Sequence, residues 1–228
     1  MSLISRIGAL DRVTLSTHDV DQWYIDEVKA AMDAGEIRYV GDYKTPDFEM
    51  IAVEKPRLSV FSTMLNSVPD VADKLDELEV PVLLDQSTYE SHPLARTEWI
   101  KLYGALFDLE DEAEKAFNEQ VSVVEELSAD EQSGKTVAIF YITSKGGIYV
   151  RNGGDYLVKM VELAGGEYIL ADMKPDESGT TQMETEAFYE GNKDADYIIY
   201  IHSLGGKPED MEKLIEINGI LSEFKAVK

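Results

Sequence analysis

The sequence predicts an α/β protein with two lobes, each built on a parallel sheet and connected by a helical segment. Three observations support this fold class. Short apolar strands alternate with helices over residues 11–85, helical periodicity alone fills residues 93–127, and a second alternation follows from residue 136. The 228 residues are enough for two modest lobes, each with its own core.

The first lobe is predicted from its alternating strands and helices. Apolar runs indicate strands at 11–17, 37–41, 58–62 and 81–85, of which 58–62 is expected to be buried. Amphipathic segments predict helices at 19–35, 45–56 and 68–80. We expect Gly35 to end the first helix, and Thr45 or Asp47 to cap the second before Pro56 ends it.

The connecting segment is helical from Pro93 to about Leu127. Its apolar side chains recur at helical spacing: Trp99, Leu102, Tyr103 and Leu106. The sequence "DLED" (108–111) interrupts the helix, and Asp108 is expected to cap the second piece. That piece, 110–127, would be about 27 Å long at 1.5 Å per residue, which suits a strut between two lobes.

The second lobe follows a polar turn at 128–135. We predict strands at 136–143 and 195–203, and helices at 153–166, 183–194 and 207–217. The expected organisation is therefore an N-terminal lobe at 1–88, linking helices at 89–133 and a C-terminal lobe at 134–228.

The charge of the chain excludes some partners. Forty-five acidic residues against 21 basic residues give a net charge of −24. A nucleic-acid-binding protein needs a basic face, and the sequence contains no dense cluster of Lys and Arg. We therefore expect no nucleic acid as a partner, and solubility alone is a sufficient reason for the acidic surface.

Several chemistries lack the residues that they need. The chain has no cysteine, and its three histidines, His18, His92 and His202, do not stand at a metal-ligand spacing. No nucleophile elbow, Walker A motif or dinucleotide-binding glycine motif is present. No run of about 18 apolar residues could span a membrane. The sequence therefore contains no motif for these enzyme classes, and a metal site could arise only from His and carboxylate side chains brought together in space.

Polar side chains gather where the predicted strands end. Ligands of open α/β sheets bind beyond the carboxyl ends of the strands. The loop 86–96 carries Tyr89, Glu90, His92 and Arg96, and the loop 144–154 carries Lys145, Tyr149 and Arg151. Arginine and tyrosine suit an anionic, oxygen-rich or chelated ligand. Taken singly, Glu90 and Arg96 could serve only as a helix cap or a mutual pair, and Tyr149 could pack in an edge strand.

Four stretches resemble one family. They are "YVGDYKTPDFEMIAVEKPRLSVFSTML" (39–65), "KLDELEVPVLLDQSTYESHPLARTEWIKLYGALF" (74–107), "GGIYVRNGGDYLVKMVELAGGEYI" (146–169) and "EAFYEGNKDADYIIY" (186–200). In order and spacing they resemble the substrate-binding proteins of ABC importers for iron–siderophore, haem and cobalamin. The segment 90–101 is similar to a subgroup signature, with Ala95 in place of a glycine.

The resemblance implies two Rossmann-like lobes with parallel sheets, joined by a long rigid helix, and a ligand in the cleft between them. The implied ligand contacts are Tyr89, Arg96, Tyr149, Arg151, Trp23, Ser62, Thr63 and His92. One glutamate of each lobe would dock onto arginines of the permease. The family's spacing places these carboxylates at Glu49 and Glu186, with Glu184 as the second choice for the latter.

The resemblance also implies partners and a location. We expect a monomer that captures a small-molecule metal chelate outside the cytoplasmic membrane and delivers it to the transmembrane subunits of an ABC permease. It would be periplasmic, or a lipoprotein on the outer face of the membrane. Iron, cobalt or an oxoanion would belong to the ligand, with no resident cofactor. Family members usually have a longer beginning and end, so we expect trimmed ends and an export signal outside this sequence.

Two other functions fit the residues. A binding protein for an oxoanion such as molybdate or tungstate would use Arg96 and the hydroxyls of "STML" (62–65). A two-lobed α/β enzyme that acts on an anionic metabolite would place Glu90 or His92 in its cleft.

Overall fold

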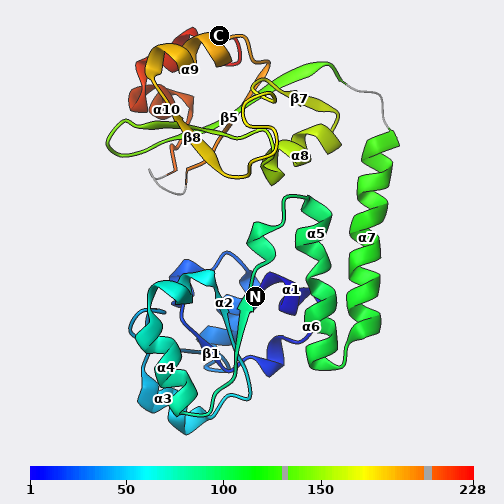
Figure 1. Cartoon of the computed structure of the whole chain (residues 1–228), viewed down its shortest axis with the longest axis vertical. Coiled ribbons are helices and arrows are strands. Elements are labelled where there is room, and N and C mark those ends of the chain that lie inside the picture. Colours follow the sequence, from blue (N-terminus) through cyan, green and yellow to red (C-terminus); the bar gives the residue numbers. More distant parts are fainter. Residues whose placement is uncertain (130–132, 203–206) are drawn as a thin grey trace. The chain divides into compact units, whose positions relative to one another are not determined.

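The computed structural model describes residues 1–129, 133–202 and 207–228 (Figure 1). The chain divides into two compact units, residues 1–89 with 96–119 and residues 90–95 with 120–228. Helix α5 (Pro93–Glu98) and helix α7 (Glu110–Ala129) each contribute to both units. Most of the predicted linking segment, 96–119, therefore groups with the first unit.

The first unit contains two pairs of parallel strands. Its strands are β1 (Leu15–Ser16), β2 (Arg38–Tyr39), β3 (Ser59–Ser62) and β4 (Val82–Asp85), paired as β1–β2 and β3–β4. Its helices are α1 (Ser2–Arg6), α2 (Asp26–Asp33), α3 (Phe48–Glu54), α4 (Pro69–Glu77) and α6 (Ile100–Phe107), together with the first part of α7. Asp47 caps α3 by accepting a hydrogen bond from the Met50 amide at 2.9 Å, as the sequence predicts.

Three local predictions for this unit are wrong. The helix expected over 19–35 begins only at Asp26, because Asp19 instead caps a 3₁₀ turn at Val20–Gln22. Strand β3 is not fully buried: its side chains alternate between the core and solvent, and Val60 is 40% exposed. Asp108 adopts the left-handed conformation, φ 56°, and ends α6 instead of capping α7.

The apolar side chains of the first unit form two clusters. One packs under the strands and contains Val40, Ile51, Leu65, Val71, Leu75 and Val80. The other joins α1, α6 and α7 and contains Ile4, Ile7, Ala9, Ile100, Tyr103, Ala113 and Ala116. A Cβ at Gly104 would lie 2.5 Å from the Cβ of Ala113, so the glycine allows α6 and α7 to approach closely.

The second unit is built on a mixed five-stranded sheet. Its strands are β5 (Lys135–Ile142), β6 (Ile148–Arg151), β7 (Gly166–Tyr168), β8 (Thr180–Met183) and β9 (Tyr197–Tyr200). Its helices, besides the end of α7, are α8 (Tyr156–Leu163), α9 (Thr185–Asn192) and α10 (Met211–Ile217). Strands β7 and β9 pair with β5 in parallel, whereas β6 pairs with β5 and β8 in antiparallel fashion.

Strand β5 forms the centre of this unit. Residues 137–140 of β5 are at most 8% exposed, and they alternate between two apolar clusters. Ala138 and Phe140 pack on the side of α9, where the rings of Phe140 and Phe188 lie 4.8 Å apart, while Val137 and Ile139 pack with residues of α8 and β7. The α/β class is therefore confirmed, with a sheet that is mixed rather than purely parallel.

Within the described residues, no helix has the length and apolar character that crossing a bilayer requires.

A partly buried hydrogen bond fixes the end of β4 to α6. The Asp85 carboxylate accepts hydrogen bonds from the Ser87 amide at 2.7 Å and from the Tyr103 hydroxyl. Burial alone would raise the pKa of Asp85, but the hydrogen bonds from Ser87 and Tyr103 outweigh it and hold the pKa below its ordinary value. Burial, and then the bond to Asp85, raises the pKa of the Tyr103 hydroxyl.

The variant Tyr103→Phe should lower the free energy of unfolding at neutral pH by about 1–2 kcal/mol, because Asp85 loses a partner for its charge. The folded-state pKa of Asp85 is depressed, so its contribution is present above the unfolded value of about 3.9 and is lost as pH falls below it. The penalty should therefore shrink in acid. Urea unfolding at pH about 7 and about 3 measures it. Tyr24→Phe, at a side chain that is 91% exposed, is the control; a penalty unchanged by pH would contradict the assignment.

Candidate functional site

In the first unit the structure joins two of the predicted ligand contacts. Strands β3 and β4 are parallel and in register, with Ser62 opposite Asp85. The chain that leaves their carboxyl ends places the Thr63 and Tyr89 hydroxyls 2.7 Å apart. The Tyr89 side chain remains 68% exposed. The exposed ring of Tyr89 therefore lies beyond these strand ends, and its hydroxyl is held by the hydrogen bond with Thr63.

The other polar residues near these strand ends have local partners. The Ser62 hydroxyl accepts a hydrogen bond from the Met64 amide at 3.4 Å and caps a 3₁₀ turn at Thr63–Ser67. Arg96, on α5, donates from Nη2 to the Thr88 carbonyl at 2.5 Å. This bond ties α5 to the loop that carries Tyr89.

Trp23 lies beside a histidine that the sequence analysis did not select. Its Nε1 donates to the hydroxyl of Ser16 at 3.3 Å, and Ser16, at the end of β1, is 5% exposed. The rings of Trp23 and His18 have centroids 5.2 Å apart and are tilted by 46°. The Ser16 hydroxyl also accepts from the His18 amide at 3.0 Å. The signal was present in the sequence, since His18 directly follows the first predicted strand.

In the second unit, Tyr149 lies between two strands and not at an edge. It is on β6, which pairs with both β5 and β8. Its ring stacks on Tyr141 of β5, with centroids 5.0 Å apart and planes within 3°. Its hydroxyl donates to Oε1 of Gln182 on β8 at 3.1 Å. Cross-strand contacts therefore hold this ring, and its role toward a ligand stays a prediction.

Arg151 is paired with a buried carboxylate. Its Nη1 lies 3.4 Å from Oδ2 of Asp155, and the two side chains are 19% and 2% exposed. Asp155 Oδ2 also accepts from the Ser178 hydroxyl at 3.2 Å and the Gly179 amide at 2.9 Å, while Oδ1 accepts from the Leu157 amide and caps α8. Arg151 was predicted as a ligand contact, whereas Asp155, which pairs with its guanidinium group inside the unit, was not predicted to take part.

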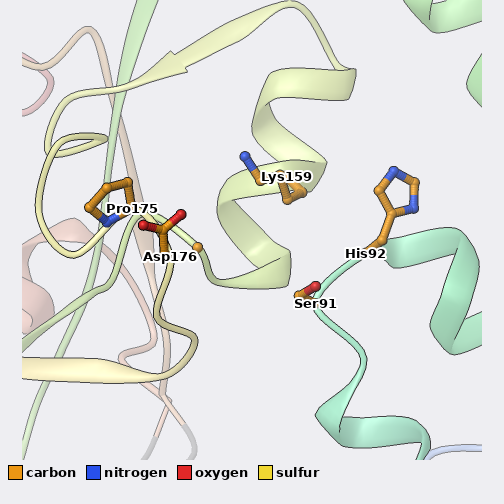
Figure 2. Close-up of a pocket in the computed structure, with 6 residues that line it drawn as sticks. Ser91, His92, Lys159, Pro175 and Asp176 are labelled. Atoms are coloured by element: carbon orange, nitrogen blue, oxygen red, sulfur yellow. The ribbon is translucent and has the colours of Figure 1, made fainter.

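Residues 91 and 92 line a pocket of about 270 Å³ in the second unit. The other lining residues are Gly154, Lys159, Pro175 and Asp176. Figure 2 shows Ser91 and His92 at the start of one helix, opposite Lys159 of α8 and the loop that carries Pro175 and Asp176. His92 was predicted as a ligand contact, whereas Lys159 and Asp176 were not, because nothing in their spacing marks them.

His92 has a structural partner as well. Its Nδ1 accepts a hydrogen bond from the Leu94 amide at 3.2 Å, which satisfies one of the free N–H groups at the start of α5. In the part of the chain that the structure describes, no group of three or more His, Asp and Glu side chains is placed to hold a metal ion.

The two predicted docking carboxylates are both exposed. Glu49 lies in the first turn of α3, and Glu186 lies in the first turn of α9. Glu184, the second choice, precedes α9 at its N-cap position and makes no capping hydrogen bond through its side chain. Either glutamate of the second unit is accessible, so the choice between them stays a prediction.

Two α/β units linked through helices agree with the two-lobed class that the sequence resembles. The chain belongs to the periplasmic binding protein family, whose model matches residues 8–228. This is a family of binding proteins, so the prediction that the chain is not an enzyme is confirmed, and the hypothesis of a two-lobed enzyme is wrong.

Relatives of the chain are distant. It is 25% identical over 209 residues to an uncharacterized lipoprotein of Methanocaldococcus jannaschii; the match covers 91% of this chain. The chain spans about half the length of that curated relative, 49%.

Solved structures share the fold at low identity. A periplasmic haem-binding protein of Vibrio cholerae, HutB, has a TM-score of 0.75 and 16% identity, with 99% of this chain and 82% of that chain covered. The IsdE protein of S. aureus, complexed with haem, has a TM-score of 0.68 and 17% identity, with 99% and 81% covered. An ABC transporter substrate-binding protein of Listeria monocytogenes has a TM-score of 0.70 and 20% identity, with 99% of this chain and 81% of that chain covered.

Replacing the buried carboxylate tests the network around Arg151. Asp155→Ala should lower the free energy of unfolding by about 3–5 kcal/mol, because it leaves Arg151 without its partner and removes the cap of α8. Equilibrium unfolding in urea measures the loss. Asp172→Ala, at an exposed position between β7 and β8, should leave the free energy of unfolding within about 0.5 kcal/mol of the parent protein. A loss below about 1 kcal/mol at Asp155 would contradict a structural role for the pair.

Proposed function

We propose that the chain is the substrate-binding component of an ABC importer and that it captures a metal chelate of the iron–siderophore, haem or cobalamin type. The observation that carries this proposal is the match of the periplasmic binding protein family to residues 8–228, together with the fold. Similar solved proteins are named for haem binding and for iron uptake, which supports this range of ligands.

The first unit offers contacts that suit a large, flat or ring-rich ligand. Tyr89 and Trp23 both follow strand ends and have hydrogen bonds that fix their polar atoms, to Thr63 and to Ser16 respectively. Aromatic side chains held in this way give contact area at little entropic cost. Ser62, Arg96, His92, Tyr149 and Arg151 complete the proposed set of ligand contacts.

We also propose how the chain meets its transporter. As a monomer outside the cytoplasmic membrane, free or lipid-anchored, it would present Glu49 and Glu186 to arginines of the permease subunits. Paired carboxylates that meet paired guanidinium groups provide register as well as attraction. Their exposure on two separate helices, α3 and α9, supports this role.

A thermal-shift screen tests the ligand class. A true ligand at a hundredfold excess over its Kd should stabilise the folded state by about 2.7 kcal/mol, which raises Tm. We expect a shift with at least one of the ferric siderophores, haem or cobalamin, and none with molybdate or tungstate. A shift with the oxoanions alone would favour the oxoanion hypothesis instead.

Trp23→Ala should weaken binding of that ligand about tenfold, the effect of losing roughly 1–1.5 kcal/mol of aromatic contact. Titration calorimetry on protein whose folding has been checked measures the change in Kd. Tyr24→Ala, at the adjacent side chain that is 91% exposed, should bind like the parent protein. Equal losses in both variants would remove Trp23 from the site.

Docking is tested by charge removal at the glutamates. Glu49→Gln and Glu186→Gln should each lower ligand-dependent ATP hydrolysis by the reconstituted permease about tenfold, while Kd for the ligand is unchanged. Glu190→Gln, on the same helix as Glu186 but paired with Lys193 at 2.6 Å, is the matched control. If Glu184→Gln has the larger effect, Glu184 is the docking residue; an effect on Kd would argue against docking.

A further inference from the structure

The pocket of the second unit carries an uncompensated negative charge. Asp176, on its rim, is exposed and has no ion pair among the described residues. Lys159, the one basic residue among the described lining residues besides His92, lies with its Nζ 2.8 Å from Oε2 of Glu162. The Lys159 ammonium group is therefore paired with a carboxylate of its own helix, whereas the Asp176 carboxylate has no ion-pair partner among the described residues.

Two basic residues that lie close in sequence to lining residues are paired with carboxylates in the same way. Arg151, next to the lining segment, is paired with buried Asp155 at 3.4 Å. Lys174, which precedes the lining residue Pro175, is paired with Glu177 at 3.2 Å. An anionic group that entered the pocket would therefore meet basic side chains that already have carboxylate partners, together with the carboxylate of Asp176.

The remaining polar side chains of the pocket are the imidazole of His92 and the hydroxyl of Ser91. Because Nδ1 of His92 accepts a hydrogen bond from the Leu94 amide, Nε2 is the ring nitrogen assigned as a hydrogen-bond donor. Ser91 adds a hydroxyl that can donate or accept. These groups suit carbonyl, hydroxamate or amide oxygens, which need no positive charge opposite them.

The charge of the whole chain acts in the same direction. A net charge of −24 produces a negative potential that attracts cations and slows the approach of anions. This effect reaches only about 10 Å at ordinary ionic strength, so it governs association rates, whereas Asp176 acts at contact distance.

From this charge balance we infer that the imported chelate is neutral or positively charged and that Asp176 receives its cationic or hydrogen-bonding part. The inference rests on the proposed function and narrows it. By charge, hydroxamate and corrinoid chelates suit a binding site that includes Asp176, whereas tris-catecholate chelates, with three negative charges, and haem, with two propionates, do not.

The test compares probes of different charge on the full chain. The cationic probes are ferrioxamine B and cobinamide, the neutral probes are ferrichrome and cobalamin, and the anionic probes are ferric enterobactin and haem. We expect at least one cationic or neutral probe to bind at least about tenfold more tightly than either anionic probe, because the Asp176 carboxylate repels an anionic probe. If it is cationic, its association rate should fall as salt is added.

Two substitutions locate the effect in the pocket. Asp176→Asn should weaken a bound cationic probe about three- to tenfold, and it should weaken a bound neutral probe less, because that probe loses only a hydrogen bond to a charged acceptor. Glu162→Gln removes the charged partner of Lys159. It should improve the binding of anionic probes relative to cationic probes, as Asp176→Asn should. Asp172→Asn, exposed on the same loop but not lining the pocket, is the matched control and should change nothing.

The outcomes separate the two claims. Tightest binding of ferric enterobactin or haem overturns the inference and leaves the proposed function standing. So does a bound cationic probe that is indifferent to Asp176→Asn. If no probe of any charge binds, the proposed function falls, and the inference falls with it.

Discussion

The buried carboxylate of Asp155 is the constraint on which the second unit depends most. One side chain, 2% exposed, caps α8, pairs with Arg151 and receives the Ser178 hydroxyl and the Gly179 amide. It thereby fixes the strand before α8, the helix itself and the loop before β8 against one another. The close packing of this loop leaves no room for side chains: a Cβ at Gly153 would lie 2.1 Å from the carbonyl oxygen of Ala171. The walls of the pocket follow from this arrangement.

The two units differ in how their charged side chains are paired. In the second unit, carboxylates pair with the basic side chains in and near the pocket, and the hydrogen-bonding groups of Ser91 and His92 and the carboxylate of Asp176 remain. In the first unit, Asp85 is stabilised by Tyr103 and Ser87, while Thr63 and Tyr89 bond to each other and expose an aromatic face. Both arrangements favour recognition by shape and hydrogen bonding over recognition by ion pairing, which is consistent with a chelate whose charge is largely cancelled by its own metal.

The sequence predicted the elements that carry strong periodicity and missed those that depend on partners. Strands β3, β4, β5 and β9 were found because apolar runs stand between clear turn signals. Strand β6 lies inside the predicted loop 144–154 and β8 was not predicted; both depend on antiparallel pairing with strands distant in sequence or across a turn. Of the predicted ligand contacts, Thr63 and Tyr89 do lie together beyond adjacent strand ends, although their role toward a ligand stays a prediction. The rule about strand ends could not reveal that Arg151 is paired with Asp155, because that contact crosses the turn from a strand to a helix and has no periodic signature.

Why an acidic binding protein should carry a further carboxylate at its pocket is a question of discrimination. Specificity is a difference between affinities, and a like charge placed against the wrong ligand is an efficient way to create that difference. The overall charge of −24 cannot by itself discriminate between bound ligands, because salt screens it beyond about 10 Å. A single carboxylate at contact distance is screened much less. The distant charges then set how often ligands arrive, and Asp176 sets which of them stay.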